Sequence, residues 1–408
     1  MQKCALVGCY ASCLADVLKR LLVQGYANNP DEMWKKVSRE GWSQKAQEAF
    51  YRLQNDHQDA VSGAPERSLL KASWRDCTEA WRGEGAKGVQ GRLYDTLQAA
   101  TRKRLLGELP GSSRPTLETP PSLDEKGQIR LRSCSGNGAS AWLGAIPFDS
   151  NHKIFPPLFR TAMRVRLGLR IPELVRQPVC GCGQRGDLEG VHGGKCPTGG
   201  GPWRRHQKVG AAFFELLTGV RYCTVGGETT MGSLGLDLTG PLAEERDKRP
   251  DLFASLPNGD SILGDVALIH PIQDATRLHR NAKKAGAAAK EKEGKKHTHY
   301  DDACRAVGIR FVPLVFETYG RPGGETVRFV KEMVRQATER LGEMNDVPAR
   351  QKIADRWWKT LSVAVQKAAA STILASVQAS RGARGTQVTE MLLGREFSAY
   401  VGLAEKKE

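Results

Sequence analysis

Apolar positions at helical spacing mark both ends of the chain. Near the start they recur at intervals of three and four residues, at Leu14, Val17, Leu18, Leu21 and Leu22. This spacing predicts helices across residues 1–109. The periodicity returns over 324–340 and 347–379, and one stripe of the last helix is expected to pack in the core: Trp357, Leu361, Val365 and Ala368.

Between these regions the pattern changes to that of β-strands. Two β-prone runs, 250–255 and 261–269, flank Pro257, Asn258 and Gly259, which form a strong turn signal. They predict a hairpin. A third run, 309–316, is apolar throughout, as a buried strand should be. The fold class that we predict is therefore α+β, with a small mixed sheet in a helix-rich protein.

Breaks in the pattern divide the chain into segments. Residues 110–129 are rich in Pro, Ser, Thr and Gly, which predicts a linker. Residues 130–178 predict a helical segment with a basic face. Residues 381–408 combine glycine with charge and are expected to fray.

The net charge narrows the class of partner. The 408 residues carry 61 Lys and Arg against 45 Asp and Glu, a formal net charge of +16. This excess favours a polyanionic partner, although charge alone does not separate DNA from RNA or from an anionic membrane. No apolar run reaches the roughly 18 residues that span a bilayer, so we predict neither a membrane span nor a signal peptide. The composition, 40% apolar and 26% charged, argues against a fibrous or wholly disordered protein.

Several basic residues are candidate nucleic-acid contacts. Between 159 and 169, one face of the predicted helix carries the apolar residues Phe159, Ala162, Met163 and Leu167, and arginines point elsewhere. The candidates in this helix and beyond it are Arg164, Arg166, Arg204, Arg205, Lys283 and Lys284. The alternative is an ordinary solvated surface.

One close group of Cys and His residues predicts a zinc site. Cys180, Cys182, His192 and Cys196 fall within 17 residues, whereas the other cysteines are scattered. Thiolate and imidazole ligands suit structural zinc, and scattered cysteines fit an intracellular, reducing compartment. A second ligand set replaces Cys180 by His206, and a glycine-rich loop with free thiols is the third interpretation.

Two aspartates on the predicted hairpin are candidate catalytic residues. Asp265 lies on a strand face between Leu263 and Ala267, and Asp251 can lie beside it if the strands pair across the turn. Two convergent carboxylates near lysines can hold Mg²⁺ against a phosphodiester, where the ion lowers the pKa of the attacking water. The alternative is a structural hairpin with a paired aspartate.

The pair of acids needs further groups for such chemistry. Glu228 or Glu215 could supply a third acid. The restriction-endonuclease-like nuclease core, which the Pro-Asp…Asp arrangement resembles, has a lysine two residues after the second acid, where this chain has Ala267. The lysine would then come from a helix-prone Ala/Lys/Glu stretch, at Lys283, Lys284, Lys290, Lys292, Lys295 or Lys296.

Taken together, these phrases resemble the C-terminal region of a non-LTR retrotransposon reverse transcriptase polyprotein with a restriction-like endonuclease. The resemblance covers about residues 130–380 and rests on motifs in the family's order. These are Leu131-Arg-Ser…Gly-Ala-Ser-Ala-Trp142-Leu, Arg164-Val-Arg-Leu-Gly-Leu169, Cys-Gly…Asp187…Gly190-x-His192…Cys196, Arg205-His206, Arg249-Pro-Asp251, Gly264-Asp265-Val, Tyr300…Cys304 and Phe311-Val-Pro-Leu…Glu317-Thr-Tyr-Gly320.

The resemblance implies a helical linker, a zinc knuckle at 179–206, an endonuclease core at 207–320 and C-terminal helices at 321–380. The resemblance implies that Asp251 and Asp265 are ligands of the catalytic metal ion. It also implies that Lys296 corresponds to the family's catalytic lysine, and Tyr300 belongs to the same sequence phrase as Lys296. The implied activity is Mg²⁺-dependent DNA nicking that primes reverse transcription, in the nucleus, with element RNA as a further partner and no membrane.

The resemblance also implies an upstream reverse transcriptase domain, which this chain lacks. The chain is therefore expected to be a fragment, a truncated copy or a host-retained remnant, and residues 1–109 would be a thumb-like or linker-like helical region. The alternative function is a catalytically inactive nucleic-acid-binding remnant that keeps the zinc knuckle.

Overall fold

The computed structural model describes residues 122–197, 201–221, 249–340 and 347–378, shorter stretches between 223 and 247, and scattered positions between 44 and 108. The chain forms two compact units, Met1–Asp124 and Glu125–Glu408. The helices predicted for 1–109 lie largely outside the described residues, although the described positions up to Leu105 are helical. The candidate functional residues all belong to the second unit.

The described elements of the second unit alternate helices with a few strands. In chain order they are α6 (Glu125–Cys134), η1 (Ala141–Gly144), α7 (Pro156–Leu167), α8 (Pro172–Arg176), α9 (Val191–Lys195), α10 (Gly201–Thr218), β1 (Thr224–Gly226), η3 (Gly232–Leu234), β2 (Leu252–Ser255), β3 (Ser261–Ile269), α11 (Ala275–Lys283), α12 (Ala287–Ala306), β4 (Ile309–Glu317), α13 (Gly324–Arg340) and α14 (Val347–Gln378).

A small mixed sheet lies at the centre of this unit, with the strand order β1-β2-β3-β4. β2 pairs antiparallel with β1 and β3, whereas β3 and β4 run parallel. The predicted hairpin is confirmed, with Ser255 opposite Ser261 at its turn. β3 has the predicted bounds, and β4 extends one residue beyond the predicted 309–316. The predicted α+β class with a small mixed sheet is therefore confirmed.

β2 begins two residues later than predicted, for a local reason. Pro250 has no amide proton to donate to a strand ladder. The Asp251 carboxylate accepts a hydrogen bond from the Val266 amide at 2.8 Å. The side chain of Asp251 thus bonds to β3 where a backbone partner would otherwise stand.

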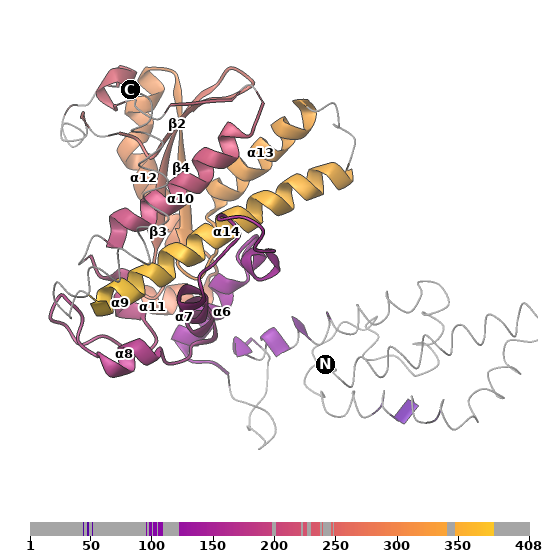
Figure 1. Ribbon diagram of the computed structural model, residues 1–408, viewed down its shortest axis with the longest axis vertical. Coiled ribbons are helices and arrows are strands. Elements are labelled where there is room, and N and C mark those ends of the chain that lie inside the picture. Colours follow the sequence, from indigo (N-terminus) through magenta and orange to yellow (C-terminus); the bar gives the residue numbers. More distant parts are fainter. Residues whose placement is uncertain are drawn as a thin grey trace, which may run out of the picture. The chain divides into compact units, whose positions relative to one another are not determined.

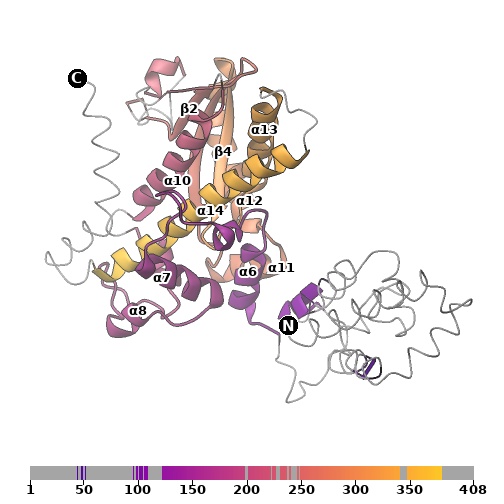
Figure 2. The same cartoon turned by 45° about the vertical axis from the view of Figure 1, so that its right-hand side comes forward.

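Helices cover both faces of the sheet. α10, α13 and α14 pack on one face, against buried strand residues such as Ile262, Val266 and Leu314 (Figure 1). α12 contacts β3 and β4 from the opposite face, where Ala289 packs with Ala267 and Val315. The turned view shows the same layers (Figure 2). Because side chains alternate along a strand, Asp265 projects toward the α12 face.

The long helix α14 is a core element. Its length and composition would allow it to cross a membrane, but 89% of its most apolar window is buried inside the fold. It contacts α7, α9, α10 and α13. The predicted core stripe is confirmed, because all four of its members are buried: Trp357, Leu361, Val365 and Ala368.

The helices cross two of the predicted segment boundaries. α6 starts at Glu125, within the predicted linker 110–129, and its acidic first residue favours a helix start. α10 starts at Gly201, within the predicted knuckle segment 179–206. α13 and α14 share one core with the sheet, so the compact fold continues past residue 320.

The apolar side predicted for the helix at 159–169 is only partly right. α7 buries Ala162 as expected, but Phe159 is 43% and Leu167 59% exposed. Its buried stripe starts at Leu158 and packs on Val363 and Ala370 of α14. The helix ends at Gly168, whose left-handed backbone turns the chain away from that contact.

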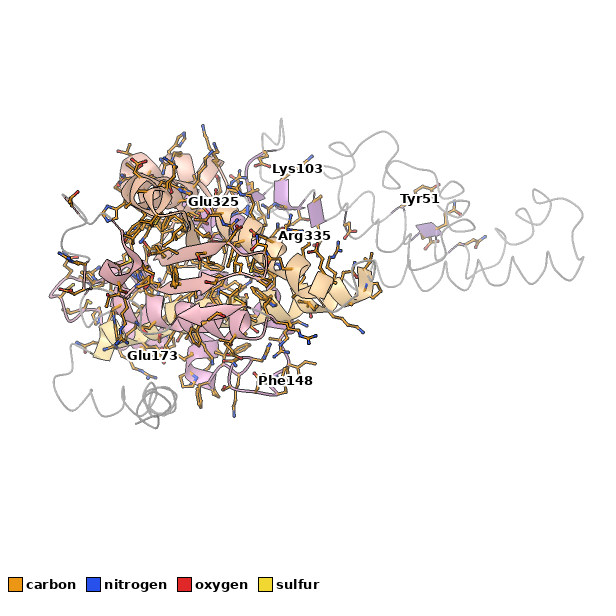
Figure 3. All side chains as sticks on the ribbon, turned by 90° about the horizontal axis from the view of Figure 1, so that it is seen from above. Tyr51, Lys103, Phe148, Glu173, Glu325 and Arg335 are labelled. Carbon is orange, nitrogen blue, oxygen red and sulfur yellow. The ribbon has the colours of Figure 1, made fainter. Side chains whose placement is uncertain are left out.

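Glu293 ties α12 to the start of α13. Its side chain is almost fully buried, and its Oε1 accepts the Glu325 amide at 2.9 Å. Glu325 is labelled in Figure 3. Burial raises the pKa of Glu293 to about 7. Because Lys296 lies one turn further along α12, this cap fixes the position of Lys296 over the sheet.

We expect Glu293→Gln to change how stability depends on pH. A carboxyl whose folded-state pKa is raised binds more protons in the folded chain, so folding loses stability as pH rises from about 4.5 to about 7. Relative to the wild type, the variant should gain unfolding free energy between pH 5 and pH 8, by at most about 3 kcal/mol. Urea unfolding at several pH values measures this.

Glu173→Gln on α8 is the matched control, and its stability should follow the wild-type pH dependence. A Glu293→Gln curve parallel to the wild type would contradict the assignment of the raised pKa to this buried cap.

Candidate functional site

The predicted zinc ligands converge on one point. One ligand atom from each of Cys180, Cys182, His192 and Cys196 lies within 4.8 Å of the others. Cys180 Sγ is 3.6 Å from Cys196 Sγ, and Cys182 Sγ is 3.4 Å from His192 Nε2. Tetrahedral zinc bonds imply edges of about 3.7 Å between two sulfurs and about 3.6 Å between sulfur and nitrogen. The cluster could therefore hold a metal ion such as zinc.

Two short pieces of backbone place these ligands. Val179 pairs with Arg185, and the Cys180 amide donates to the Gln184 carbonyl at 2.9 Å, which forms a tight turn around Cys182. The Asp187 carboxylate accepts the amides of Val191 and His192 at 2.9 and 2.6 Å, and so caps the helix that carries His192. Sequence reasoning gave Asp187 no role, because the amides of Val191 and His192 come close to its carboxylate only when α9 forms.

The glycines of the knuckle also permit close packing. A Cβ at Gly193 would meet Ser376 Oγ at 2.8 Å, and one at Gly194 would meet His270 Cδ2 at 2.8 Å. The knuckle therefore lies directly on α14 and on the end of β3. These two glycines are therefore needed for packing.

His206, the alternative fourth zinc ligand, lies at the other candidate site. It is not a member of the Cys/His cluster, and its Nδ1 is 3.9 Å from Asp251 Oδ2. Cys180 joins the cluster because only Gly181 separates it from Cys182 in the turn, whereas His206 is held on α10. Burial and the positive charge of Lys296 lower the pKa of His206.

Burial raises the pKa of the Cys180 thiol, with hydrogen bonds and charge repulsion from the neighbouring thiols adding to it. Zinc binds the thiolate, so binding would release a proton from this residue.

The two predicted catalytic aspartates lie side by side. Leu252 pairs with Gly264, so the next position on each strand brings Asp251 opposite Asp265. Burial and the negative charge of Asp265 raise the pKa of Asp251, and a hydrogen bond joins the two carboxyl groups. Asp265 is 9% exposed in the middle of β3. Two carboxyl groups this close share a site that favours a cation.

Lys296 supplies the cation. Its Nζ forms an ion pair with Asp265 Oδ2, although the two residues are 31 positions apart in sequence. Lys296 Nζ also lies 6.0 Å from the centre of the Tyr300 ring, which packs against Phe311 of β4. Of the candidate lysines on α12, Lys296 is the one that contacts an aspartate of the pair.

Lys292 lies one turn before Lys296 on α12. Burial and the neighbouring charge of Lys296 lower the pKa of Lys292. Lys283 and Lys284 are exposed at the end of α11, and Lys290 is exposed on α12. Glu215, a candidate third acid, accepts a hydrogen bond from Asn151 at 2.8 Å. Glu228 lies outside the described residues.

Three of the arginines proposed as nucleic-acid contacts bind their own fold. Arg205 is 6% exposed and donates to the Gly194 carbonyl. Arg166 donates to Ser140 Oγ at 2.7 Å, and Arg164 donates to the Arg170 carbonyl at 2.8 Å. Arg204 is partly exposed on the first turn of α10.

Comparisons of the chain with protein-family models, with curated proteins and with solved structures find no match.

We expect one zinc ion per chain in freshly purified, reduced protein. Cys180→Ser should lose most of the bound zinc, whereas His206→Ala should keep it, because His206 is not part of the cluster. Metal analysis by mass spectrometry measures both variants. Full zinc content in Cys180→Ser would show that the ligand set is different.

Removing the zinc with a chelator should loosen residues 179–205, since binding energy in a structural zinc site is folding energy. Hydrogen exchange would detect this as faster exchange of the α9 amides, with the α13 amides as an internal control. Unchanged exchange of α9 would contradict a structural role for the ion.

Proposed function

We propose that this chain is a Mg²⁺-dependent DNA-nicking endonuclease with a restriction-like core, from the C-terminal region of a non-LTR retrotransposon protein. It would cut one phosphodiester bond of a DNA target in the nucleus, so that the new end primes reverse transcription. A reverse transcriptase domain upstream of this region and element RNA are the partners that the resemblance implies.

The observation that carries the proposal is the convergence of Asp251, Asp265 and Lys296. They come from the start of β2, the middle of β3 and the middle of α12, and they contact one another through Asp265. The Pro-Asp…Asp motif indicates the two aspartates, and the family resemblance indicates Lys296. A structural hairpin needs only one partner for Asp265, so a second carboxyl, Asp251, at the same point supports a site for a cation.

The donor set fits Mg²⁺. Two carboxylates and water are ligands that this ion prefers, and a bound Mg²⁺ would stabilise charge on the phosphate and lower the pKa of a water. Asp251 is held in place by the Val266 amide and Asp265 by its strand, so both carboxylates are positioned before substrate arrives.

Lys296 has two tasks in this scheme. In the absence of substrate, its ammonium group balances the charge of Asp265. With a phosphodiester beside the acids, the same ammonium can donate to a phosphate oxygen or to the attacking water. His206 Nδ1, on α10, lies 3.9 Å from Asp251 Oδ2.

The second candidate function is a non-cleaving nucleic-acid-binding protein. The zinc cluster and the net charge of +16 favour it, because neither depends on the aspartates. Binding would then rest on phosphate contacts, which position a protein on DNA without reading its sequence.

We expect the chain to nick supercoiled plasmid DNA when Mg²⁺ is present. Asp265→Asn should lower the rate by at least about a hundredfold, because losing an ion ligand costs several kcal/mol in the transition state. Lys296→Met should also lower the rate while leaving zinc content unchanged. Conversion of supercoiled to open-circular plasmid on a gel measures the rate.

Asp302→Asn on the exposed side of α12 is the matched control, because its side chain is 96% exposed. It should nick like the wild type. Binding of the plasmid with no Mg²⁺-dependent nicks, unchanged in Asp265→Asn, would favour the non-cleaving alternative.

A further inference from the structure

We propose that a cavity between the zinc knuckle and α12 binds a phosphate-bearing nucleotide. The cavity has a volume of about 550 Å³. This is within the range of pockets that hold small ligands, roughly 300 to 1,000 Å³. Its walls come from four helices (α9, α10, α11 and α12), from the end of β3 and from the residue after it: Lys195, Arg205, Leu268, His270, Arg277 and Lys292.

The charge of the cavity favours an anion. Five cationic side chains and two carboxylates line it. Glu291 already pairs with Arg277, Arg280 and Lys295, and Asp274 pairs with Arg277. Within the described part of the chain, Lys195 and Lys292 have no carboxylate within 4.0 Å. Two ammonium groups are therefore available to an anionic ligand.

A buried donor without a partner also belongs to a residue that lines the cavity. Arg205 is 6% exposed, and its Nε has no hydrogen-bond partner among the described residues. A buried donor without an acceptor costs free energy. His270 is equally buried, and its Nδ1 accepts the Ile272 amide at 3.2 Å. The ring proton is therefore on Nε2, which makes Nε2 a second donor.

Apolar residues complete the wall. Leu268, Ile269 and Ala288 contribute apolar surface beside these donors. A bare phosphate would leave this surface uncovered, whereas the sugar or base of a nucleotide would cover it. The combination of an anionic group with an apolar body is the chemistry of a nucleotide.

The cavity adjoins the acid pair on three elements. On α10, Arg205 lines the cavity while His206 approaches Asp251. On α12, Lys292 lines it while Lys296 pairs with Asp265. On β3, Leu268 follows Asp265 by three residues, about 10 Å along a strand. We infer that the ligand is a nucleotide flanking the cleaved bond, and this part rests on the proposed function.

The test measures binding of a fluorescent single-stranded oligonucleotide to the full zinc-loaded chain without added Mg²⁺. Lys195→Ala/Lys292→Ala should weaken binding by about tenfold or more, and lower the slope of log affinity against log salt by about 1.4. Lys331→Ala/Lys352→Ala removes the same charge from exposed positions on α13 and α14, and should change affinity by less than threefold.

Competition identifies the ligand. A deoxynucleoside 5′-monophosphate should displace the oligonucleotide from the wild type, and the unphosphorylated nucleoside should not. The Lys195→Ala/Lys292→Ala variant should lose this displacement. Inorganic phosphate competing as well as the monophosphate would overturn the nucleotide assignment in favour of a simple anion site.

Two controls keep the outcomes distinct. Zinc content and thermal unfolding are measured for each variant, because Lys195 adjoins Cys196; if Lys195→Ala loses zinc, Lys292→Ala alone decides. Equal affinity of the cavity and control variants overturns the cavity proposal, whatever the nicking assay gives. A weakened cavity variant together with a wild type that never nicks supports the cavity and overturns the proposed endonuclease.

Discussion

The fold of the second unit depends on placing a carboxylate inside a sheet. Asp265 stands in the middle of β3, where every residue from 262 to 268 is buried. A charge in such a position is costly unless an opposite charge and hydrogen bonds accompany it. Lys296 supplies that charge, so α12 must pack on this face of the sheet in the position that brings Lys296 next to Asp265. The small residues Ala288 and Ala289 let the helix approach the strands, and the Glu293 cap fixes its other side to α13.

Much of this arrangement could be predicted from the sequence because its signals are local. The turn at Pro257 to Gly259 and the alternation of β3 fixed the hairpin register, and with it the meeting of Asp251 and Asp265. The spacing from Cys180 to Cys196 indicated the metal cluster for the same reason. Lys296 could be selected among six lysines only through resemblance to a family, because its partner is 31 residues away.

Other features could not be predicted, since they depend on contacts between distant elements. His206 sits beside Asp251 because α10 crosses the sheet at that point, and no spacing between the two residues indicates it. The buried side of α7 was misjudged because Leu158 and Phe159 are equally apolar, and only the position of α14 decides between them. Arg205 was predicted to be a surface cation, but its guanidinium is buried and donates a hydrogen bond to the Gly194 carbonyl of the knuckle.

The contact of Gly194 with His270 limits whether the zinc knuckle can be moved to another protein or replaced by another knuckle. Zinc knuckles are short, and a short segment held by one ion invites the view that it can be cut out and grafted elsewhere. Here Gly193 and Gly194 leave room for Ser376 of α14 and for His270 after β3, so this part of its surface fits one neighbour. Transplanting it would leave that surface without its complement, and exchanging it for another knuckle would introduce a clash. The knuckle and the sheet therefore pack as one unit, and insertions should be tolerated at its exposed turn near Gly183 rather than at its ends.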